Sequence, residues 1–152
     1  MKSVQFFRDL PYSKPDISFR FYETTILDKS TFPDFVKEEL LLDENSIVTI
    51  EAVKGETPTH TDVPPRQAHL IFYISNNPMS VTTKDGNFVL NYGDSMVIDS
   101  TSEHSGSVGD LQKGRFFAID YGKNYQETME IYQKITRKNG WLFLKNLYNI
   151  AY

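Results

Sequence analysis

Short apolar or alternating stretches, separated by turn residues, fill the chain from residue 46 to residue 121. The stretch 69–75 (HLIFYIS) is almost continuously apolar, which predicts a buried central strand. Lys84-Asp85-Gly86 separates two further stretches, and Asp-Gly is a strong hairpin signal. Short strands with frequent turns are typical of a β-sandwich or barrel. We expect strands at 17–27, 47–53, 69–75, 80–83, 87–90, 95–99, 105–108 and 114–120.

Two segments show helical periodicity instead. Thr31 followed by Asp34 resembles a capping box and predicts a short helix that ends near Leu42. Asn124 followed by Glu127 predicts the start of a second helix.

The segment after this second helix is more apolar and aromatic than the helix itself. Gly140 is the candidate C-terminal cap of the helix. The apolar, aromatic segment 141–152 fits either a further short helix covering the core or a contact between the subunits of a homodimer. We expect a single domain over 1–152, with its core at about 46–121 and a helical segment at about 124–150.

Composition narrows the function classes. The chain has 11 Phe and 9 Tyr, and this aromatic content favours strands. A net charge of -4 argues against a nucleic-acid groove, and no apolar run approaches the roughly 20 residues that span a bilayer. The absence of cysteine excludes disulfides and thiolate metal sites. The first ten residues are too polar for a signal peptide, so we expect a cytoplasmic location without membrane or nucleic-acid partners.

His60-Thr61-Asp62 and the distant His104 form the most specific motif. Side chains at i and i+2 of an extended segment point the same way, so His60 and Asp62 can face one metal ion. Two imidazoles and one carboxylate are the protein ligands of a facial Fe(II) site. An isolated His-x-Asp is more often a chance surface triplet. The conjunction with a buried strand, a Gly-Asp turn and a distal His favours metal binding.

Basic and polar residues near this motif are candidates for binding small molecules. Arg115 starts the last core strand and can bind a carboxylate through two guanidinium nitrogens at once, whereas the single ammonium of Lys113 fits less well. His69 and Tyr73 share one face of their strand with Ser75, as a pocket wall requires. For His69, a surface position at the strand entry fits equally well. Arg66 is a candidate for receiving a substrate carboxylate, or it is simply solvated.

Several segments together resemble the Fe(II)/2-oxoglutarate-dependent oxygenases, in the aspartyl/asparaginyl β-hydroxylase-like or proline-hydroxylase-like branch. They are His60-Thr61-Asp62, RQAHLIFYISNNP (66–78), NYGDSMVIDSTSEHSGSV (91–108) and GRFFAIDYG (114–122). The resemblance implies a mainly β, double-stranded β-helix fold (jelly roll, cupin-like) with a few flanking helices. It implies Fe(II) bound by His60, Asp62 and His104, and 2-oxoglutarate held by Arg115 with help from His69. The chain departs from proline-hydroxylase-like relatives in having no tyrosine on the strand before His60, and Tyr73 is the candidate replacement.

The function expected from this resemblance is hydroxylation of an amino acid, a peptide side chain or a small metabolite with O2. Groups that could orient the ligands are Thr59, Thr61, Ser100 and Ser102. Two other classes fit the sequence. A cupin-like metal protein that does not use 2-oxoglutarate would keep the three ligands and place no demand on Arg115. A non-catalytic β-sandwich for binding or assembly would bind no metal.

Overall fold

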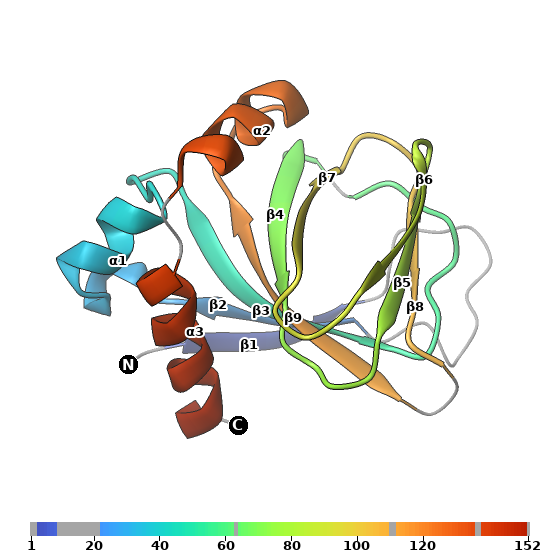
Figure 1. The fold of residues 1–152 in the computed structure, drawn as a ribbon, viewed down its shortest axis with the longest axis horizontal. Coiled ribbons are helices and arrows are strands. Elements are labelled where there is room, and N and C mark those ends of the chain that lie inside the picture. Colours follow the sequence, from blue (N-terminus) through green and yellow to red (C-terminus); the bar gives the residue numbers. More distant parts are fainter. Residues whose placement is uncertain (1–2, 9–21, 63, 110–111, 136–137, 152) are drawn as a thin grey trace.

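The computed structural model describes residues 3–8, 22–62, 64–109, 112–135 and 138–151, and it contains two antiparallel sheets. The six-stranded sheet has the order β1-β2-β3-β9-β4-β7, and the three-stranded sheet has the order β6-β5-β8. In Figure 1 the helices gather on one side of the larger sheet, and the smaller sheet lies on its other side. The strands are β1 (Ser3–Arg8), β2 (Tyr22–Leu27), β3 (Ile47–Lys54), β4 (Ala68–Tyr73), β5 (Met79–Thr83), β6 (Gly86–Leu90), β7 (Ser95–Asp99), β8 (Ser105–Ser107) and β9 (Lys113–Asp120).

The central part of the larger sheet is buried on both faces because its strands are apolar at successive positions. All six residues of β4 are buried. Leu70 and Phe72 belong to the core cluster under the helices, whereas Ile71 and Tyr73 belong to the cluster between the two sheets. This alternation follows from the pleat of a strand, which sends successive side chains to opposite faces. The continuous apolar run therefore predicted the central strand correctly.

In the described ranges, three helices and one 3-10 turn accompany the sheets: η1 (Lys29–Thr31), α1 (Asp34–Glu39), α2 (Tyr125–Lys134) and α3 (Lys138–Ala151). Val36 of α1 and Leu144 of α3 are fully buried in the helix-side cluster. Trp141 stacks on Phe72 of β4, with ring centroids 4.6 Å apart. Within the chain, segment 141–147 therefore covers the core. None of the helices in the described ranges is long and apolar enough to cross a membrane.

The helix boundaries differ from two sequence predictions. Thr31 does not cap the first helix, because α1 begins at Asp34 after Pro33, which makes no side-chain cap. Gly140 is not a C-terminal cap, because α2 ends at Lys134 and Gly140 lies inside α3. A Cβ at Gly140 would lie 2.9 Å from Leu40 Cγ, so glycine permits a close approach of α3 to the end of α1.

The start of α2 agrees with the sequence prediction. Asn124 Oδ1 accepts a hydrogen bond from the backbone N of Glu127 over 2.8 Å. The N-terminal part of the predicted strand 17–27 lies outside the described residues, and β2 covers the rest.

Candidate metal centre

A short antiparallel pairing brings the two ends of the motif together. The backbone N of His60 donates to His104 O over 3.0 Å, and the backbone N of His104 donates back to His60 O over 2.9 Å. Asp62 N donates to Ser100 O over 2.9 Å, which continues the pairing. Local extended geometry thus places His60 and Asp62 on one side, as their i, i+2 spacing requires.

The side chains of His60, Asp62 and His104 converge. One ligand atom of each lies within 4.8 Å of the others. Asp62 Oδ1 is 3.6 Å from His60 Nε2 and 3.3 Å from His104 Nε2. The His60 and His104 ring centroids are 4.6 Å apart. Ligand atoms around a shared ion lie at such separations, since each metal–ligand bond is about 2.1 Å long.

The outer nitrogen of each histidine is held by the backbone. His60 Nδ1 lies 2.7 Å from Pro58 O, and His104 Nδ1 lies 2.8 Å from Ser102 O. A carbonyl oxygen only accepts, so each Nδ1 must carry the hydrogen. In the neutral ring this leaves the Nε2 lone pair facing Asp62, which is the tautomer a metal ligand needs.

Electrostatics around Asp62 favour its charged form. Burial opposes ionisation, but His104 and His60, which donate to Asp62 through Nε2 when their rings are protonated, hold the pKa of Asp62 well below its usual range. Its Oδ2 atom is buried and accepts no hydrogen bond among the described residues. Burial opposes protonation of His104 too, yet Asp62 raises the pKa of His104. Asp62 therefore offers an ionised carboxylate to a cation.

His69 lies beside the triad, in the interior. It is 4% exposed, and its Nδ1 is 2.8 Å from Ser100 Oγ and 3.4 Å from Asp62 Oδ2. Burial, aided by the charge of Arg66, lowers the pKa of His69 well below its usual value. The surface alternative for His69 is therefore wrong, and a neutral imidazole supports Asp62.

Arg66 is held by a residue that the sequence analysis missed. Arg66 Nη2 donates to Glu51 Oε2 over 2.7 Å, and Nη1 lies 3.9 Å from Asp62 Oδ2. Glu51 is 1% exposed, and Thr49 Oγ1 donates to it over 2.6 Å. A glutamate inside the buried strand 47–53 was the signal, because a buried carboxylate requires a partner. Arg66 is thus neither simply solvated nor free for a substrate carboxylate while Glu51 holds it.

The structure does not bring Arg115 to the metal cluster. Phe117 and Ile119 of β9 belong to the helix-side cluster, whereas Phe116 and Ala118 belong to the cluster between the sheets. Arg115 shares the face of Phe117 and Ile119, and its backbone pairs with Ala52. Its side chain therefore starts from the face opposite to His69. Arg115 lies two residues before Phe117 on the same strand, so the alternation of side chains along the strand already placed it on that face.

Lys113 and Tyr73 are also remote from the triad. Lys113 has the parity of Arg115 and pairs with Lys54. Tyr73 faces the space between the sheets but is four residues from His69, about 13 Å along the strand. Its hydroxyl donates to Asn77 O. Of the candidate orienting groups, Ser100 and Ser102 contact the cluster, whereas Thr59 and Thr61 are exposed.

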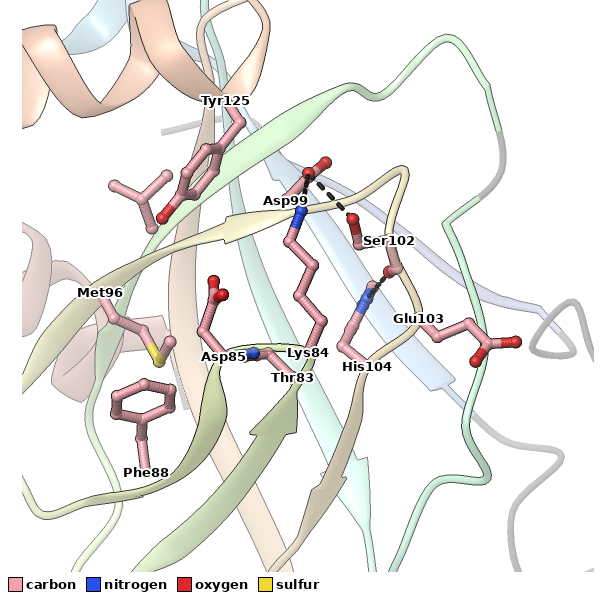
Figure 2. A pocket seen from close by; sticks show the side chains of 11 residues that line it. Thr83, Lys84, Asp85, Phe88, Met96, Asp99, Ser102, Glu103, His104 and Tyr125 are labelled. Atoms are coloured by element: carbon pink, nitrogen blue, oxygen red, sulfur yellow. Dashed lines mark hydrogen bonds and ion pairs between the residues drawn. The ribbon is translucent and has the colours of Figure 1, made fainter.

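A small cavity of about 60 Å³ adjoins His104 and Ser102. Figure 2 shows Lys84 reaching across it to Asp99, and the two charged groups are 3.8 Å apart. Phe88, Met96 and Tyr125 form its apolar wall. Its size admits water or a comparably small molecule.

Comparison with solved structures identifies the fold. A cupin-2 domain of Rhodospirillum rubrum matches 80% of this chain and 71% of its own, with 11% identity and a TM-score of 0.53. A cupin-like protein of Thermotoga maritima matches 77% of this chain and 80% of its own, with 14% identity and a TM-score of 0.47. The polyketide cyclase RemF of Streptomyces resistomycificus matches 67% of this chain and 66% of its own, with 17% identity and a TM-score of 0.47.

No protein-family model matches the chain, and no curated protein matches its sequence. At these identities the likeness concerns architecture alone. The predicted jelly roll is confirmed, and the chain has the cupin fold.

Proposed function

We propose that this chain is a mononuclear metal protein of the cupin fold that binds Fe(II) through His60, Asp62 and His104 and oxidises a small molecule with O2. The observation that carries the proposal is the convergence of two Nε2 atoms and one carboxylate oxygen within 4.8 Å. The donor set fits the ion, because two imidazoles and a carboxylate suit Fe(II) and leave coordination positions open.

The surrounding residues support the ligands in a way that suits this role. Pro58 O and Ser102 O fix the two rings. Arg66 faces Asp62 Oδ2 at 3.9 Å, which opposes rotation of the carboxylate away from the histidines. When bound, the ion would supply redox chemistry and open positions for a substrate oxygen and O2.

Anaerobic titration calorimetry with Fe(II) tests this proposal. We expect one ion per chain, with affinity falling at least 100-fold in His104→Ala. Glu103→Ala is the matched control, because Glu103 is an exposed neighbour outside the triad. No heat of binding in the wild type, or equal affinity in His104→Ala, would contradict the proposal and favour a non-catalytic sandwich.

The placement of Arg115, away from the metal cluster, favours a mechanism that does not use 2-oxoglutarate. Hydroxylation dependent on 2-oxoglutarate is the second candidate, and the observation in its favour is the Arg66 guanidinium close to Asp62. Glu51 already binds this guanidinium, so the co-substrate would have to compete with Glu51.

Addition of 2-oxoglutarate to the anaerobic Fe(II) protein distinguishes the two candidate mechanisms. The second candidate requires a weak visible charge-transfer band, lost in Arg66→Lys and kept in Arg115→Ala. If the protein binds Fe(II) but shows no such band after 2-oxoglutarate is added, the mechanism that does not use 2-oxoglutarate is supported.

A further inference from the structure

A cavity of about 210 Å³ lies over the larger sheet and reaches the candidate metal centre. Its floor comes from β2, β3 and the end of β9, and Pro64, Pro65 and Arg66 form another part of its wall. Asp62 lines it as well. A molecule in this cavity would therefore lie next to a ligand of the metal centre.

Hydrogen-bond acceptors exceed free donors along the cavity wall. Arg66 and Thr49 already donate to Glu51. Thr24 is 5% exposed, and its hydroxyl has no hydrogen-bond partner among the described residues. An unpartnered buried hydroxyl is unfavourable, so a ligand that bonds to it recovers free energy.

Charge points to a cationic ligand. The cavity wall contains three carboxylates, Glu51, Asp62 and Asp120, but one guanidinium, Arg66. Glu51 and Arg66 form a pair, and a bound metal ion would use Asp62. Asp120 then adds a negative charge that the guanidinium does not balance. A dicarboxylate would meet acceptors and repulsion, whereas an ammonium would meet an opposite charge.

Thr24 and Asp120 lie at the two ends of the cavity floor, and aliphatic side chains flank the line between them. Thr24 pairs with Glu51, and Asp120 pairs with Ile47 at the other end of β3. Their backbones are about 13 Å apart along the strands and about 10 Å apart across them. Thr49 lies midway between them, and Ile26 and Ile47, which are 39% and 47% exposed, flank this line on one side. An elongated aliphatic molecule fits this pattern.

We propose that this cavity binds an elongated aliphatic amine with a hydrogen-bond donor at each end, its ammonium at Asp120 and its second donor at Thr24. Binding of this molecule does not depend on the proposed function; its role as the substrate of the metal centre rests on that function.

Two-dimensional NMR titration of the full chain tests the proposal, first with chelator present and then with Zn(II). Three probes with six carbons each separate the contributions: hexamethylenediamine with two donor ends, hexylamine with one donor end, and adipate with two acceptor ends. We expect saturable shifts around Thr24 and Asp120, with the diamine binding at least ten-fold more tightly than adipate.

Two variants assign the ends. Thr24→Val should weaken diamine binding about three- to ten-fold and leave hexylamine within two-fold, because one hydrogen bond is lost at one end. Asp120→Asn should weaken both amines about ten-fold. Thr82→Val and Asp85→Asn, on the hairpin of the other sheet, are matched controls that should change nothing.

Three results would each overturn the proposal: adipate binding as tightly as the diamine, no saturable shift near Thr24 or Asp120, or Thr24→Val weakening both amines equally. The metal proposal fails separately, if Zn(II) leaves the His60 and His104 signals unmoved. Amine binding with chelator present would then still support the cavity assignment.

Discussion

The buried pair of Arg66 and Glu51 allows a quantitative test of how the metal centre is supported. Glu51 is 1% exposed and the Arg66 side chain 14%, so removal of either partner leaves a largely buried charge. Loss of one member of a buried pair typically destabilises a protein by about 3–5 kcal/mol. Arg66→Met leaves Glu51 with Thr49 as its donor, and we expect a loss of about 3 kcal/mol. Glu51→Leu leaves Arg66 partly solvated and near Asp62, and we expect about 2 kcal/mol.

The double variant is the informative measurement. Replacing both members by apolar residues of similar size leaves no unpaired charge. The loss of unfolding free energy in the double variant should therefore be smaller, by at least about 2 kcal/mol, than the sum of the losses in the two single variants. Chemical denaturation of all four proteins measures this, and Arg66→Met should also lower Tm by about 6–12 °C. Additive losses, or a loss below about 1 kcal/mol in Arg66→Met, would refute the reasoning.

Further expectations concern the metal, the core and the helix contact. Saturating Zn(II) should raise Tm of the wild type, because an ion that binds only the folded state stabilises it, and Asp62→Asn should abolish the rise in a thermal melt. Tyr121→Phe should lower the free energy of unfolding by about 1–2 kcal/mol, because the buried Leu40 carbonyl loses its donor. Burial raises the pKa of Tyr121 in the folded state, so wild-type stability should fall as pH rises above about 10, and denaturation should show a weaker fall in Tyr121→Phe. Gly140→Ala should destabilise by about 1 kcal/mol despite better helix propensity, because the new Cβ would lie 2.9 Å from Leu40 Cγ; a gain in Tm would contradict this contact.

The strands of the core could be predicted from the sequence because strand periodicity and turn residues are local signals. Segment 95–99 agrees with β7, and the expected hairpin joins β5 to β6 through Lys84-Asp85, with Gly86 as the first residue of β6. The helix boundaries failed where tertiary contact overrides a local signal. Gly140 resembles a cap but serves the packing of α3 against Leu40.

The candidate site was predicted in part for similar reasons. The i, i+2 geometry of His60 and Asp62 is local, and one distal histidine completed the set that the structure brings together. Arg115 was assigned by its spacing, although its parity with Phe117 already placed it on the helix-covered face. The Glu51 contact to Arg66 joins segments that only the folded sheet brings together.

Anomalous scattering from crystals grown anaerobically with Fe(II) tests the central claim most directly. The account predicts a single strong peak about 2.1 Å from His60 Nε2, His104 Nε2 and an Asp62 carboxylate oxygen, absent in His104→Ala crystals. A peak elsewhere in the molecule, or none between these three side chains, would contradict it.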